Sequence, residues 1–118
     1  MSATAVRFFR ILTAEDPTLD DFLSGAAQGD EPPRTDDPLV HRMWQGISVY
    51  ATETQARKKA KASRLGDYIA ELSVPVGGSI AFRRTGGSRA RGHHTLWGDP
   101  EELMACITRV VAVENGPT

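Results

Sequence analysis

The sequence predicts an α+β fold: one domain, residues 1–118, on a mixed or mainly antiparallel sheet of about five or six strands with three or four helices. Strand-like segments outnumber helical ones and do not alternate strictly with them. No GxGxxG or GxxxxGKS/T motif follows a strand, which argues against a doubly wound nucleotide-binding fold. The length, with 40% hydrophobic and 25% charged residues, is typical of a single globular domain.

The N-terminal third is expected to form one strand and two helices. Residues 6–12 are rich in β-formers and apolar on both alternating faces, which predicts a central strand covered on both sides. Thr18 can cap a helix over residues 19–28, and Asp37 followed by Pro38 starts a second, shorter helix. The side chains expected to face the core from these helices are Leu19, Phe22, Leu23, Ala26, Val40, Met43 and Trp44.

The middle of the chain predicts a strand that leads directly into the clearest helix. The strand covers residues 47–51, and Thr52 with Gln55 forms a capping box for a helix that reaches about Ser63. Small residues on its inner side let this helix lie close to a sheet. They are Ala56, Ala60 and Ser63, and the opposite side carries Arg57, Lys58, Lys61 and Arg64.

The C-terminal half is expected to contain four more strands and one helix. The glycines of Pro75–Ser79 suit a hairpin loop between the first two strands. Asp99 and Pro100 are expected to start a helix whose first turn carries acids, and residues 115–118 are expected to form a flexible tail. The strands are expected at residues 68–74, 80–84, 93–97 and 109–113, and the helix is expected to bury Leu103, Cys106 and Ile107.

Charge is sorted along the chain although the net charge is only −1. Residues 1–37 carry a balance of −5, residues 57–92 a balance of +7 and residues 93–118 a balance of −3. A cationic middle on a near-neutral protein indicates a local anionic partner such as a phosphate, nucleotide, nucleic acid or acidic protein face. The alternative is a solvated basic helix and loop without a ligand.

Other features argue against a membrane, secreted or metal-binding protein. No apolar run approaches the roughly 20 residues that span a bilayer, and the N-terminus lacks the basic and apolar regions of a signal peptide. A single cysteine, Cys106, cannot form an internal disulfide and suits a reducing compartment, so we expect a cytoplasmic protein. The neighbours His93 and His94 point to opposite faces of a strand, so we expect no metal.

Residues on three of the predicted strands are candidates for binding a nucleotide. Arg10 on the first strand could hold a phosphate or form an ion pair with Glu71 or Glu15. Ser48 and Tyr50 share one strand face and could line a cleft, while the Glu71 carboxylate could orient a ribose or act as a base.

The segment that contains His94 and Trp97 could add stacking or a phosphate contact. The alternative is that Trp97 belongs to the core and that His93 or His94 forms its polar lid.

A second candidate site is a basic surface made by residues 57–64 and 83–91. Glycines in the second segment let backbone N–H groups approach phosphate, and its arginines supply charge. The residues expected to bind an anion or nucleic acid are Arg57, Lys58, Lys61, Arg64, Arg89 and Arg91.

Four segments resemble a family of small bacterial proteins of about this length, a resemblance that implies no activity. They are Phe9–Thr13, Trp44–Ser48, Tyr68–Leu72 and His93–Pro100 (His-His-Thr-Leu-Trp-Gly-Asp-Pro). The chain also resembles the ADP-ribosyltransferase fold. That resemblance implies that Arg10 holds NAD, that Ser48 and Tyr50 form the strand motif that precedes a helix and line the nicotinamide side, and that Glu71 or Glu101 acts on the ribose.

The leading hypothesis is therefore a nucleotide-binding protein of the ADP-ribosyltransferase type. It would use NAD, with Arg10 and Glu71 as catalytic residues and with Ser48, Tyr50, His94 and Trp97 as cofactor contacts. The alternative is a non-enzymatic module that binds nucleic acid or an acidic protein through the basic surface. A regulatory or toxin–antitoxin-type interaction protein is a third interpretation, and the sequence leaves open whether the protein is an enzyme.

Overall fold

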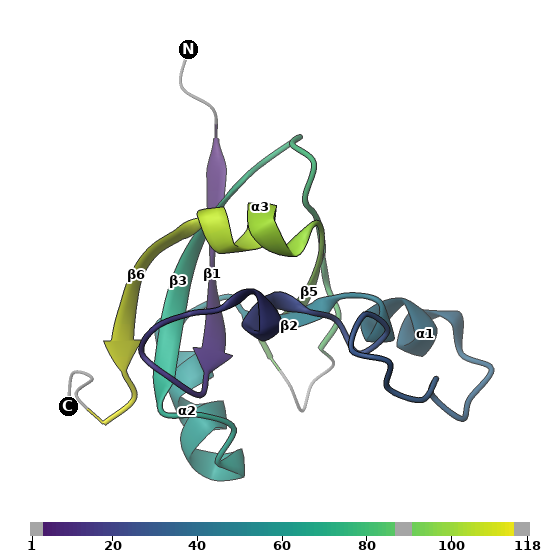
Figure 1. The fold of residues 1–118 in the computed structure, drawn as a ribbon, viewed down its shortest axis with the longest axis horizontal. Helices are drawn as coiled ribbons and strands as arrows, with labels where there is room; N and C mark the ends of the chain where they lie inside the picture. The colour runs from purple at the N-terminus through teal and green to yellow at the C-terminus, as the bar shows by residue number, and fades with distance from the viewer. Residues whose placement is uncertain (1–3, 87–90, 115–118) are drawn as a thin grey trace.

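The computed structural model describes residues 4–86 and 91–114, in which six strands form one antiparallel sheet (Figure 1). The strand order is β4-β5-β2-β1-β3-β6, so β1 is central and β4 and β6 form the edges. The α+β prediction with a mainly antiparallel sheet is confirmed. The strands are β1 (Ala5–Leu12), β2 (Ile47–Tyr50), β3 (Tyr68–Pro75), β4 (Ala81–Arg84), β5 (His93–Trp97) and β6 (Ile107–Ala112).

Three α-helices begin at the residues that the sequence predicts. They are α1 (Pro38–Trp44), α2 (Glu53–Ser63) and α3 (Pro100–Ala105). The N-cap side chains of Asp37, Thr52 and Asp99 each accept a hydrogen bond from a backbone N–H in the first turn. In α2 the reciprocal half of the capping box is not made, because the buried Oε1 of Gln55 has no hydrogen-bond partner and lies against Gly92.

The sheet separates two apolar cores, which define its two faces. The first lies on the face that α3 covers, here called the α3 face, and contains Phe8, Leu12, Phe22, Val49, Leu72, Leu96 and Leu103. The second lies on the α2 face, where Ala56 and Ala60 of α2 pack against Phe9, Tyr50, Ile69 and Val113. The expectation that the first strand is covered on both sides is confirmed, since Phe8 and Phe9 are both buried.

The helix expected over residues 19–28 is wrong except for its first turn. Only Leu19–Phe22 is helical, as a 3₁₀ turn (η1) with Thr18 at its N-cap. Beyond it, the chain packs against the end of α1: Ala26 N–H donates to the Trp44 carbonyl, and a Cβ on Gly25 would lie 2.8 Å from the Trp44 ring. Phe22 is buried as expected, whereas Leu19 is exposed.

The hairpin expected at Pro75–Ser79 is also wrong. The strands β3 and β4 lie at different places in the sheet and are not paired, because β1 and β6 occupy both sides of β3. The segment after β3 is instead a crossover that carries the chain over the sheet to its opposite edge (Figure 1). The hairpin partner of β4 is β5.

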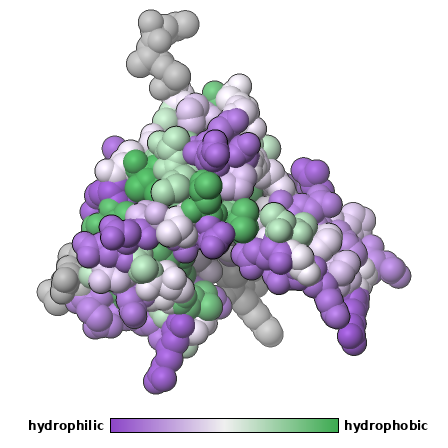
Figure 2. All heavy atoms as spheres, in the orientation of Figure 1, coloured by the Kyte–Doolittle hydropathy of each residue, from purple (hydrophilic) through white to green (hydrophobic). Residues whose placement is uncertain are grey.

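The helix α1 lies away from the main core. None of its residues is fully buried, and Val40, which was expected to face inward, is exposed, so that expectation is wrong. Figure 2 shows mostly hydrophilic atoms over the part of the molecule that contains α1, and apolar atoms gathered over the middle of the same view. Near the C-terminus, Ile107 belongs to β6 and not to the preceding helix.

Candidate functional site

Arg10 is engaged by the protein backbone. Its guanidinium donates from Nε and Nη2 to the Asp21 carbonyl at 3.1 and 2.9 Å, and from Nη1 to the Ser48 carbonyl at 2.7 Å. Burial lowers the pKa of Arg10, while Asp21 and Tyr50 act in the opposite direction. Its partners are therefore carbonyls and not the carboxylates of Glu15 or Glu71. Arg10 joins β1, η1 and β2.

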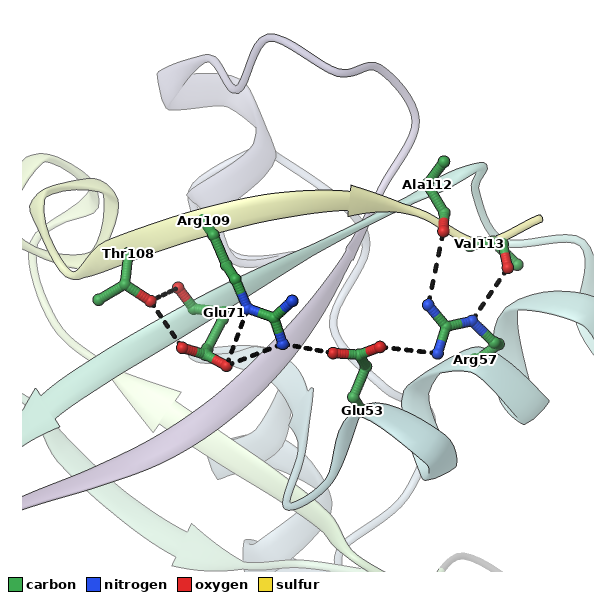
Figure 3. Close-up of polar contacts among 7 residues, drawn as sticks. All are labelled: Glu53, Arg57, Glu71, Thr108, Arg109, Ala112 and Val113. Carbon is green, nitrogen blue, oxygen red and sulfur yellow. Dashed lines mark hydrogen bonds and ion pairs between the residues drawn. The ribbon is translucent and has the colours of Figure 1, made fainter. Parts of the chain in front are cut away.

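Glu71 is likewise held in a polar network (Figure 3). Its carboxylate accepts hydrogen bonds from Thr108 Oγ1 at 2.8 Å and from Arg109 Nε at 3.3 Å. The register between β3 and β6 shifts at this point, next to the pairing of Glu71 with Arg109. These contacts tie the edge strand β6 to β3.

The network continues from Arg109 into α2 (Figure 3). Arg109 Nη2 lies 2.5 Å from Glu53 Oε1, and the other oxygen of Glu53 lies 2.8 Å from Arg57 Nη1. Hydrogen bonds from Arg57, and then from Arg109, lower the pKa of Glu53 against the effect of burial. Arg57 also donates to the carbonyls of Ala112 and Val113. Arg57 is therefore occupied inside the protein and is not part of an exposed basic surface.

The residues expected to hold NAD do not all share one face of the sheet. Arg10 pairs with Ala70 and Glu71 pairs with Phe9, and adjacent residues on a strand point to opposite faces. The Arg10 side chain therefore leaves β1 on the α3 face, and the Glu71 side chain leaves β3 on the α2 face. Tyr50, which pairs with Phe9, shares the α2 face with Glu71, and its burial raises the pKa of its hydroxyl.

His94 and Trp97 also lie on opposite faces. The His94 ring is on the α3 face, 5.1 Å from the Phe8 ring, and its Nδ1 is 2.9 Å from the Gly92 carbonyl. His93 points to the α2 face, where its Nδ1 contacts Thr85 Oγ1 at 2.8 Å. Burial lowers the pKa of His93 most strongly, and His94 and Lys59 lower it further.

The two basic segments of the sequence are adjacent on the α2 face. The first turn of α2 contacts the turn before β5, since Gln55 lies against Gly92, the neighbour of the exposed Arg91. One turn further along α2, the charge of Lys59 is close enough to influence His93. Arg83 is exposed on β4 and pairs with Thr95, which places it on the same face.

The basic residues at the other end of α2 have a different setting. Lys61 and Arg64 line an open depression of about 510 Å³ together with the acids Asp67 and Glu114. Charges of both signs therefore meet there, in contrast to the side of α2 that faces β5. Arg89 lies outside the described residues.

Beyond α2, the sheet leaves part of this face open to solvent. Ser48, Ala81 and Arg83 are exposed there, and Trp97 is half-buried. Arg42 of α1 lies over the Trp97 ring, with its guanidinium carbon 4.9 Å from the ring centroid. We call this surface, made by Arg42, Ser48, Ala81, Arg83 and Trp97, the open half of the α2 face.

Sequence reasoning did not single out Arg42, Lys59 or Arg83 for the site. Arg83 and Lys59 lay within the two basic segments, so their charge was a usable signal. Arg42 had no comparable signal, because its place beside Trp97 depends on how α1 packs at the end of β5.

The described residues contain no group of three or more His, Cys, Asp or Glu side chains placed to hold a metal ion. Within residues 4–86 and 91–114, no helix has the length and apolar character needed to cross a bilayer. A second cavity, of about 60 Å³ between η1 and α3, has room for little more than water. No protein-family model, no curated protein and no solved structure matches the chain.

Proposed function

We propose that the protein is a non-enzymatic module that binds nucleic acid through a basic surface on the α2 face. The surface consists of Lys58, Lys59, Arg83 and Arg91. The observation that supports it best is the contact between Gln55 and Gly92, because it brings two basic segments that are distant in sequence side by side. All four side chains are exposed and can reach a phosphate backbone.

The acids on the same face do not cancel this charge. Glu53 is paired with Arg57 and Arg109, and Glu71 with Arg109. Since these carboxylates are already neutralised by internal partners, the exposed lysines and arginines keep their positive field. Seven of the eight acids of residues 1–37 are exposed, and they belong to a different part of the chain.

The geometry favours this function over NAD binding. Each of the polar groups on the Arg10 guanidinium has a backbone acceptor, so a pyrophosphate would have to displace Asp21 and Ser48 carbonyls. Glu71, the expected ribose contact, starts from the other face and is held by Thr108 and Arg109. Binding of an acidic protein that nucleic acid does not displace would instead support the alternative of an acidic protein partner.

The test is the salt dependence of binding to labelled oligonucleotides, followed by fluorescence anisotropy. Four phosphate contacts predict a slope of log K against log salt of about −3, or a roughly 50-fold loss of affinity between 50 and 200 mM salt. Lys59→Ala with Arg83→Ala should weaken binding and reduce this slope by about 1.4.

A matched control is Lys61→Ala with Arg64→Ala, which removes the same two residue types and the same charge from the mixed-charge depression. We expect it to bind nearly as tightly as the wild type. Equal losses in the two double variants would show that only the net charge matters. Absence of oligonucleotide binding at 50 mM salt would refute the proposal, and a parallel titration with NAD tests the alternative.

A further inference from the structure

The open half of the α2 face carries a pair of planar side chains beside the basic surface. The guanidinium of Arg42 lies over the Trp97 ring at 4.9 Å, while the indole Nε1 donates to the Arg42 carbonyl at 2.7 Å. On the strand side, a Cβ on Gly46 would lie 2.9 Å from Trp97 Nε1, so the indole fits closely over this glycine. The ring is thus held in a fixed orientation although it is half-exposed.

We propose that the nucleic acid is single-stranded and that one of its bases stacks on the Arg42–Trp97 pair. This inference rests on the proposed function. Indole rings and guanidinium planes are the side chains on which unpaired bases stack, and every base offers a π-face to them. A base within a duplex is covered by its neighbours and cannot use such a platform.

The spacing between the platform and the basic surface suits a single strand. Ala81 pairs with Trp97, so Arg83 lies two residues further along the adjacent strand. Strand rise and strand separation place the two Cα atoms about 8 Å apart. Neighbouring nucleotides of one strand can therefore place a base on the platform and a phosphate at Arg83, and the exposed Ser48 hydroxyl offers a hydrogen bond on the same face.

Binding of a duplex would have a different effect on Trp97. It would use the phosphate-binding residues of α2, Lys58 and Lys59, and would leave the environment of Trp97 unchanged. The fluorescence of Trp97 therefore distinguishes the two ligands.

The experiment uses the Trp44→Phe variant, in which Trp97 is the only tryptophan. Trp44 Nε1 has no hydrogen-bond partner in the described structure, so this change breaks no such bond. The variant is titrated at 50 mM salt with a thymidine 15-mer and with a 15-base-pair duplex. We expect quenching of Trp97 by the single strand alone, and at least tenfold tighter binding of the single strand.

Two further variants test the platform itself. Trp97→Leu should lower single-strand affinity about 5- to 150-fold, the range for loss of one stacked base, while its duplex affinity stays the same. Arg42→Ala leaves the indole in place and should also weaken single-strand binding. Its control is Arg34→Ala, which removes the same charge from an almost fully exposed site.

The outcomes separate this inference from the proposed function. Equal affinity for both ligands without quenching would overturn stacking while leaving nucleic-acid binding intact. Unchanged single-strand affinity in Arg42→Ala and in folded Trp97→Leu would do the same. Failure of both oligonucleotides to bind would overturn both proposals together.

Discussion

Replacing Arg10 by methionine removes a clamp that joins three parts of the fold. The substitution keeps an apolar stem of similar length but leaves the carbonyls of Asp21 and Ser48 without their donors. The Asp21 carbonyl loses two donors at a part-buried site, whereas the Ser48 carbonyl loses one at an exposed site where water can replace it. Since an unsatisfied buried polar group costs about 1–3 kcal/mol, we expect a loss of about 2 kcal/mol. Unfolding a domain of this size has an entropy of about 0.25 kcal/mol/K, which converts the loss to a decrease in Tm of roughly 8 °C.

Thermal unfolding followed by circular dichroism measures this change. Arg7→Met is the matched control, because Arg7 is an exposed arginine on the same strand. We expect the control to lie within about 2 °C of the wild type, as most surface substitutions do. An Arg10→Met protein with an unchanged Tm would refute the clamp and would return Arg10 to the candidates for ligand binding.

Three more predictions concern stability. The pKa of His93 is lowered in the fold, so the stability that this shift contributes is complete above the unfolded pKa of 6.5 and is lost as the pH falls through the folded pKa. Urea unfolding midpoints measured from pH 7.5 to 5 should show this loss in the wild type and less of it in His93→Gln. Arg64 has a φ of 51° at the end of α2, so Arg64→Gly should raise the unfolding free energy by about 1 kcal/mol in urea titrations, and a destabilised variant would contradict the strain. Gly46→Ala places a Cβ 2.6 Å from the Leu96 carbonyl and 2.5 Å from Thr95 Cγ2, so we expect a loss of more than about 2 kcal/mol, and a normal Tm would show that β5 can move aside.

Local signals predicted the helix starts well. Asp37 and Asp99 each precede a proline, and Thr52 stands three residues before Gln55. The interaction that makes such a residue a cap lies within a single turn, so the sequence contains all of it. The same is true of the strands, whose alternation reflects burial on one or both faces.

The errors arose where distant parts of the chain decide the outcome. Pro75–Ser79 has the composition of a hairpin loop, yet β3 already pairs with β1 and β6. Arg57 looked like one more solvated base on a helix. Its partners Glu53 and Val113 include one that is 56 residues away, and no local pattern indicates that contact. Arg10 and Glu71 were expected to act in one site or to form an ion pair, but only the register shows that their side chains lie on opposite faces of the sheet.

The contacts at the two edge strands of the sheet, β4 and β6, affect how readily molecules of the protein associate at high concentration. Unpaired edge strands can recruit strands from other molecules and so cause aggregation. At one edge, the exposed Arg83 and Arg84 of β4 repel a second copy of themselves. At the other edge, the register shift beside Glu71 interrupts the regular ladder between β3 and β6, and Arg57 binds the carbonyls of Ala112, the last residue of β6, and of Val113. Arg57 therefore occupies two backbone acceptors at one end of this edge, which leaves fewer groups there with which a strand of another molecule could pair.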